Sequence, residues 1–250
     1  MPLSLLKKGM RNAEEIIRQL KAKGTAERAE HAQRYFKTGK GEYAEGDVFW
    51  GVVVPEQRQI ATKYGKSLAL EDVLSLLKHE VHEVRLTAIF IMVRLFERGD
   101  AATKTVVYNA YLNHTDYINN WDLVDSSAHK IVGAHLLHQN DASILYKLAE
   151  SSLLWDQRIA IIATLAFIHM GELDHTFDLA LKLIGHPHDL MHKAVGWMLR
   201  EAGKKDLERL RTFLYAHSQN MPRTMLRYAI EKFPENERKH ILHVVSKVHG

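Results

Sequence analysis

The stretch that decides the fold is Gln157-Arg158-Ile159-Ala160-Ile161, because similar segments recur along the chain in a constant register. The other copies are Val84-Arg85-Leu86-Thr87-Ala88, His192-Lys193-Ala194-Val195-Gly196 and Leu226-Arg227-Tyr228-Ala229-Ile230. Their cations are separated by 73, 35 and 34 residues, and the first gap is two periods whose midpoint falls at Asp122. The resulting period predicts a curved α-solenoid, in which antiparallel helix pairs stack and one helix of each pair lines the concave side.

Composition and spacing also favour an almost all-helical protein. Only five prolines and fourteen glycines occur in 250 residues, and apolar residues recur mainly at helical spacing. Each of Pro55, Pro187, Pro222 and Pro234 precedes a run of helix formers, which predicts helix starts there. We expect one domain over residues 1–250, with helices at 1–37, a glycine-rich loop at 38–54 and the repeats at 55–250.

The composition excludes several classes of protein. With 46% hydrophobic and 26% charged residues, the chain is neither disordered nor collagen-like. The absence of cysteine excludes a disulfide framework, a thiolate zinc site and a cysteine nucleophile. The longest uncharged apolar stretch, residues 159–171, is far shorter than the roughly 18 residues that span a bilayer. We expect a cytoplasmic monomer that does not enter membranes.

The recurring cation is the first functional signal. Equivalent positions of a solenoid project in a row, so Arg85, Arg158, Lys193 and Arg227 should form a stripe, which Arg200 could widen. A stripe of cations suits the phosphates of a DNA duplex, and the net charge of +4 favours an anionic partner mildly. The alternative is that these residues are ordinary solvated helix residues that pair with neighbouring acids.

The repeat unit around Asp122, which departs from the pattern of the other four, is the second functional signal. Asp122 replaces the cation, and Asp125 occupies a position that is small or apolar in the other units. A carboxylate there is partly desolvated, and such a group is kept where it is hydrogen-bonded, paired or used. Trp121 lies one helical turn before Asp125, on the same face. Two interpretations stay open: a functional pair, or an aspartate at a helix end with a tryptophan in the core.

Trp197, beside Lys193 and Arg200 on the fourth repeated helix, is a second candidate aromatic residue for this site. The sixteen histidines do not predict a metal site, because no cysteine or clear carboxylate completes either of their clusters, which are His186, His188 and His192, and His240 and His243. The glycine-rich loop lacks the pattern of a phosphate-binding loop. We therefore expect neither a metal nor a cofactor.

Four runs of sequence resemble the DNA alkylation repair family of HEAT-like DNA glycosylases. Two are residues 35–43 and 46–52, and the sharpest are Trp121-Asp122-Leu123-Val124-Asp125 and Lys193-Ala194-Val195-Gly196-Trp197-Met198-Leu199-Arg200-Glu201. The resemblance covers nearly the whole chain. It implies HEAT-like helix pairs with a basic concave face that binds double-stranded DNA containing alkylated bases.

The resemblance implies a monofunctional glycosylase of base excision repair, which excises positively charged N3- or N7-alkylated purines. It implies that Asp125 is the catalytic aspartate, that Trp121 and Trp197 surround it, and that Arg158 holds the DNA backbone near the lesion. Some relatives with this fold have lost the catalytic residues and only bind unusual DNA. A DNA-structure-binding protein without turnover, and a protein–protein scaffold, are therefore the alternatives.

Overall fold

The computed structural model describes residues 3–139 and 141–248 and divides the chain into two compact units, Met1–Ser127 and Ala128–Gly250. Helices and short helical turns make up the described elements, and no strand is among them; one isolated bridge joins Val48 to Val81. The predicted all-α fold is confirmed. Pro55 lies in the first turn of its helix, and Pro222 and Pro234 directly precede theirs, as predicted.

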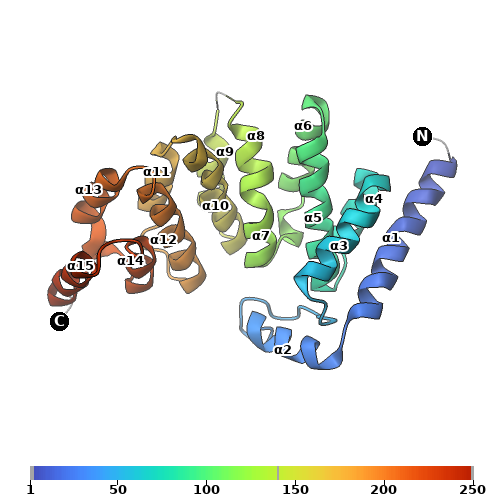
Figure 1. Cartoon of the computed structure of the whole chain (residues 1–250), viewed down its shortest axis with the longest axis horizontal. Coiled ribbons are helices and arrows are strands. Elements are labelled where there is room, and N and C mark those ends of the chain that lie inside the picture. The colour runs from blue at the N-terminus through green and yellow to red at the C-terminus, as the bar shows by residue number, and fades with distance from the viewer. Residues whose placement is uncertain (1–2, 140, 249–250) are drawn as a thin grey trace. The chain divides into compact units, whose positions relative to one another are not determined.

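Helices that alternate along the chain lie side by side in the first unit (Figure 1). Helix α1 packs on α3, α3 and α4 pack on α5, and α5 packs on α6. The helices of this unit are α1 (Leu3–Lys23), α2 (Ala26–Phe36), α3 (Val54–Tyr64), α4 (Leu70–Leu77), α5 (His82–Arg98), α6 (Ala101–Leu112) and α7 (Trp121–Ala128). Helix α5 is buried along most of its length and forms the centre of the unit.

The second unit repeats this arrangement. A π-helical turn, His129–Gly133, packs on α10, α10 packs on α12, and α12 packs on α14, while α9, α11 and α13 pack against this row. The helices are α8 (Ala134–Leu136), α9 (Ser143–Ala149), α10 (Leu154–Met170), α11 (Asp174–Lys182), α12 (Asp189–Gly203), α13 (Leu207–His217), α14 (Arg223–Ala229) and α15 (Glu235–Val248). Serial packing of paired helices is the arrangement of an α-solenoid.

Two glycines allow the helices of the second unit to approach closely. An added Cβ at Gly133 would overlap the carbonyl oxygen of Ala163, and one at Gly196 would lie 2.5 Å from the carbonyl oxygen of Met225. A side chain at Gly133 would force its backbone away from α10, and one at Gly196 would force α12 away from α14.

The predicted glycine-rich loop occupies residues 37–53 and joins α2 to α3. The backbone N–H of His82 donates to the Val48 carbonyl at 2.9 Å, which ties the loop to the start of α5. Gly51 has a φ of 77° and lies against α2, where an added Cβ would be 2.4 Å from the backbone nitrogen of Ala29. The loop therefore packs between α2 and α5 instead of forming an open phosphate cradle.

Candidate active site

The first two turns of α7 carry two of the predicted site residues. Trp121 and Asp125 are both half-buried and lie one turn apart on this helix. The buried Asn120 accepts a hydrogen bond from the backbone N–H of Trp121 through its Oδ1, at 2.8 Å, and so fixes the start of the helix.

Four aromatic rings form a cluster in the first unit: the rings of Phe36, Phe49 and His82 contact one another, and Trp121 stacks on Phe36. The ring centroids of Trp121 and Phe36 are 5.4 Å apart at 16°, those of Phe36 and Phe49 are 5.0 Å apart at 21°, and those of Phe49 and His82 are 4.6 Å apart at 23°. The four rings come from α7, α2, the loop and α5. Tyr35, which is 60% exposed, meets the Trp121 ring edge-on at 6.1 Å.

A chain of buried charges lies beside this ring cluster. The Nε2 of His82 is 2.8 Å from Oδ2 of Asp122, and its Nδ1 is 3.3 Å from Oδ2 of Asp47. Arg85 Nη2 donates to the other Asp47 oxygen at 2.6 Å, and Asn120 Nδ2 donates to Asp47 at 3.3 Å. The side chains of His82 and Asp47 are almost inaccessible to solvent, so their charges act at short range and with little screening.

These contacts fix the protonation state of His82. Burial lowers the pKa of its imidazole, but Asp122 and Asp47 outweigh burial and raise the pKa to about 9. Burial likewise raises the pKa of the Asp47 carboxyl, and His82 and Arg85 outweigh it and leave the pKa below its ordinary value. At neutral pH an imidazolium therefore lies between two carboxylates.

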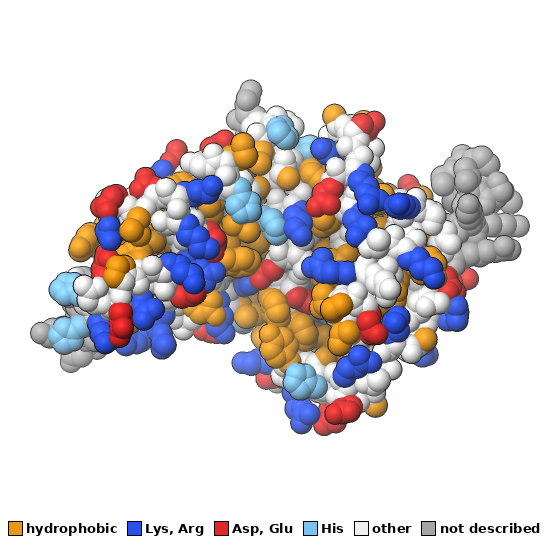
Figure 2. Space-filling model, viewed as in Figure 1, with side chains coloured by type: hydrophobic (Ala, Val, Ile, Leu, Met, Phe, Trp, Pro, Cys, Tyr) orange, Lys and Arg blue, Asp and Glu red, His pale blue; other side chains and the backbone are white. Residues whose placement is uncertain are grey.

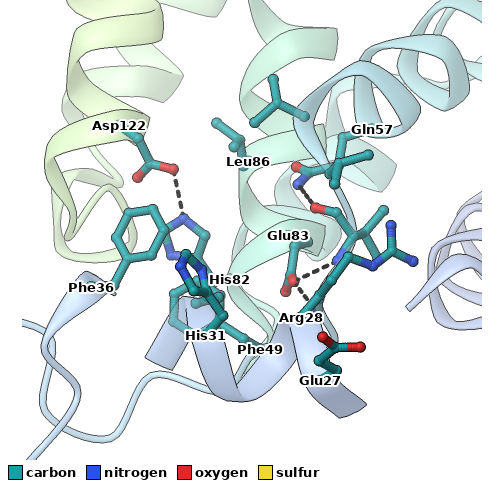
Figure 3. A pocket seen from close by; sticks show the side chains of 15 residues that line it. Glu27, Arg28, His31, Phe36, Phe49, Gln57, His82, Glu83, Leu86 and Asp122 are labelled. Carbon is teal, nitrogen blue, oxygen red and sulfur yellow. Dashed lines mark hydrogen bonds and ion pairs between the residues drawn. The ribbon is translucent and has the colours of Figure 1, made fainter. Parts of the chain in front are cut away.

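A cavity of about 380 Å³ opens beside the ring cluster, and Phe36, Phe49, His82 and Asp122 are among its lining residues (Figure 3). The buried carboxylate of Glu83 forms part of its wall and holds the loop, because it accepts hydrogen bonds from the backbone N–H groups of residues 50–52 at 2.7 to 3.1 Å.

Arg85 differs from the expected stripe of solvent-facing cations. It is 4% exposed, and its guanidinium donates to Asp47 and to the carbonyl oxygens of His79 and Glu80. The sequence register identified the position correctly as part of a repeat but could not show that Asp47, 38 residues earlier, lies beside it. Arg85 joins the loop to α5 inside the fold.

The remaining predicted residues lie in the second unit. Trp197 is half-buried on α12, and Arg158 is 4% exposed and donates through Nη1 to the Leu190 carbonyl at 2.5 Å. Lys193 pairs with the carboxylate of Asp189 at 2.7 Å. Two further cations complete the set: Arg200, which pairs with Glu201 and Glu231, and Arg227, which is exposed on α14.

Lysine and arginine side chains lie scattered over the face shown in Figure 2, with hydrophobic side chains gathered near α2 in the first unit. Sequence reasoning missed four residues of the site: Phe36, Asp47, Phe49 and His82. The first three lie in the two family-like runs at residues 35–43 and 46–52, and that was the available signal.

The described residues contain no cluster of three or more histidine, cysteine, aspartate or glutamate side chains that could hold a metal ion. The histidines at the start of α12 have other contacts: Nδ1 of His188 accepts from the Leu190 N–H, and Nε2 of His192 lies 2.5 Å from the His186 carbonyl. Within the same residues, none of the helices has the length and apolar character needed to cross a membrane.

The fold and site define an all-helical repeat protein with a tryptophan and carboxylates at the start of α7. A family model described as DNA alkylation repair enzyme matches residues 16–233. The chain therefore belongs to the DNA alkylation repair family and has a role in DNA repair, which confirms the resemblance seen in the motifs.

One solved structure, described as a predicted DNA alkylation repair enzyme from Enterococcus faecalis, is similar to this chain with a TM-score of 0.67. The match covers 85% of this chain and 98% of that chain at 17% sequence identity, so it supports the fold alone. The curated proteins contain no match to this sequence.

Proposed function

We propose that the protein is a monofunctional DNA N-glycosylase, which hydrolyses the N-glycosidic bond of positively charged N3- or N7-alkylated purines in duplex DNA. The observation that carries the proposal is the first turn of α7, where Trp121 is stacked on Phe36 and stands one turn before the half-buried Asp125. The proposal also draws on membership of the DNA alkylation repair family.

The chemistry needs few groups. An N3- or N7-alkylated purine already carries a positive charge and leaves as a neutral base, so the enzyme needs no general acid. The transition state needs stabilisation of the cation that develops on the deoxyribose. Asp125 supplies a negative charge for this cation or orients the attacking water. Trp121 and Trp197 attract the cationic base or sugar through their ring faces, worth roughly 0.5 to 2 kcal/mol each.

The duplex lies along the basic concave face of the HEAT-like repeats in this proposal. Arg158 holds the DNA backbone near the lesion, which requires its guanidinium to exchange the Leu190 carbonyl for a phosphate. Lys193, Arg200 and Arg227 neutralise phosphates, the first two after release of their carboxylate partners. Arg227 is the clearest phosphate ligand because it is exposed on α14. Arg85 is assigned a structural part, since its guanidinium is held by Asp47 and two carbonyl oxygens. The protein acts as a cytoplasmic monomer without a metal or cofactor.

Release of free base from duplex DNA containing 7-methylguanine or 3-methyladenine tests the proposal. We expect release by the wild type and a loss of about 10²- to 10³-fold in rate for Asp125→Asn, with DNA binding kept. Asp116→Asn, the same substitution at an exposed aspartate, is the matched control and should behave as the wild type. Binding by the wild type without any base release would refute the enzyme and support a DNA-structure-binding protein.

A further inference from the structure

We propose that His82 is a positioning residue for the catalytic turn: bridging Asp47 and Asp122, it locks the start of α7 and thereby orients the Trp121 ring. The orienting role rests on contacts in the first unit, and its effect on base release rests on the proposed glycosylase function. His82 itself is buried and has no direct part in the reaction.

Two separate routes connect His82 to Trp121. The first is polar, since Nε2 of His82 is 2.8 Å from Asp122, the residue next to Trp121 in the first turn of α7. The second is aromatic, since the His82 ring contacts both Phe49 and Phe36, with centroid separations of 4.6 and 4.9 Å, and Phe36 stacks on the indole at 5.4 Å. Both routes start at His82, so a change there reaches the indole through the start of α7 and through Phe36.

The bridge requires the charged form of the imidazole. Only an imidazolium has an N–H on both ring nitrogens, and a neutral ring would leave one of the two carboxylates without its donor. Asp47 and Asp122 are 9% and 13% exposed at their side chains, so solvent does not replace the lost donor well. Loss of either bond removes a charge-assisted contact from a largely buried carboxylate, and we expect the start of α7 or the loop to move in response.

The groups that face His82 favour this charge. Asp47 comes from the loop and Asp122 from α7, while Arg85 and Glu83 come from α5 itself. Arg85 opposes the imidazolium but pairs with Asp47, and the Glu83 carboxylate is occupied by backbone N–H groups of the loop. On α2, the charged or titratable groups that line the adjoining cavity are Glu27, Arg28 and His31.

The proposal also gives the glycine-rich loop a purpose. The loop supplies Asp47 to the polar route and Phe49 to the ring cluster. Its position is fixed by the hydrogen bond from the Gly51 N–H to Glu83 and by the close approach of Gly51 to α2. The loop therefore supports His82 of α5, which in turn contacts the first turn of α7.

The indole N–H signal of Trp121 reports this role without any catalysis. The chain has four tryptophans, so ¹⁵N-labelled protein gives four such signals, and Trp121→Phe assigns the relevant one. We expect the Trp121 signal to titrate with a midpoint at about pH 9, the pKa of His82. Trp155, on α10 in the second unit, serves as the control and should not follow that titration. His82→Gln should abolish the titration and displace the Trp121 signal; an unchanged Trp121 signal in both proteins overturns the proposal.

Single-turnover base release at saturating enzyme tests the functional effect. A misplaced indole should slow release by His82→Gln about 10- to 100-fold while DNA affinity changes little. Asp47→Asn keeps the bond to Asp122 and should slow release less. Val107→Ala, which truncates a buried side chain of α6 that takes no part in the ring cluster or the charged bridge, controls for loss of stability. The wild-type rate should also fall above about pH 9, and the fall should be absent in His82→Gln.

The outcomes separate the two proposals. If the wild type releases base and His82→Gln loses no more rate than Val107→Ala, the positioning role is refuted while the glycosylase stands. If the wild type releases no base, the glycosylase is refuted, and the titration of the Trp121 signal alone decides whether His82 orients that ring.

Discussion

The buried charge on His82 predicts that raising the pH destabilises the first unit alone. The pKa of this imidazole rises from 6.5 to about 9 on folding. Each pKa step corresponds to about 1.36 kcal/mol, so the protonated ring stabilises the folded first unit by roughly 3 kcal/mol. Because the folded-state pKa is the higher one, this contribution is complete below about pH 6.5 and is lost as the pH rises through about 9.

Urea unfolding followed by the ¹⁹F signals of fluorotryptophan measures the two units separately. Trp50 and Trp121 report on the first unit, and Trp155 and Trp197 report on the second. Wild type and His82→Gln are compared below pH 6.5 and above pH 9, so that the other titrating groups cancel. The wild type should lose roughly 3 kcal/mol more than the variant, and only in the first-unit signals.

The reasoning is refuted by equal losses in the two proteins, which would mean that His82 is neutral in the folded protein. An extra loss of the same size in the Trp155 and Trp197 signals would also refute it, because the carboxylates that bind His82, Asp47 and Asp122, both lie in the first unit.

Three further predictions follow from backbone contacts and exposure. Gly51→Ala should destabilise the first unit more than Gly41→Ala in urea unfolding: both have φ near 80° and strain of about 1 to 2 kcal/mol, but only Gly51 would clash with α2. Gly196→Ala should cost the second unit about 1 to 3 kcal/mol by overpacking against α14, and a stability equal to wild type would contradict that contact. Arg227→Gln should lower the slope of log binding constant against log salt by about one in DNA-binding titrations, whereas Arg85→Gln should destabilise the protein and leave the slope unchanged.

The sequence register was sufficient to predict the fold. Each of the five aligned positions lies on a helix, and these helices are α5, α7, α10, α12 and α14. The periodicity succeeds because stacking of helix pairs requires the same apolar and small residues at the same helical position in every unit. The helix starts at prolines and the glycine-rich loop were predictable for a local reason, since both depend on backbone preferences of single residues.

The site was only partly predictable. Trp121 and Asp125 were found because they break the repeat, and a break is visible along one sequence. The bridge of His82 between Asp47 and Asp122 joins residues 35 and 40 positions apart, and nothing in their local spacing indicates that they meet. The π-helical turn at His129–Gly133 has no local signal either, because its extra residue is accommodated by packing on α10.

The recurring cation therefore serves two different purposes in one register. Repetition gives each unit the same position, but neighbouring loops and helices differ, and they decide what the side chain contacts. At Arg85, the nearby carboxylate of Asp47 pairs with the cation inside the fold. At Asp122, where an acid takes the repeat position, His82 of α5 supplies the positive charge. A cation exposed to water, such as Arg227, replaces counterions at a phosphate more readily than a guanidinium held by a buried carboxylate, as Arg85 is. The salt dependence of DNA binding should consequently reflect the exposed cations of the repeat and be smaller than a count of every aligned cation would give.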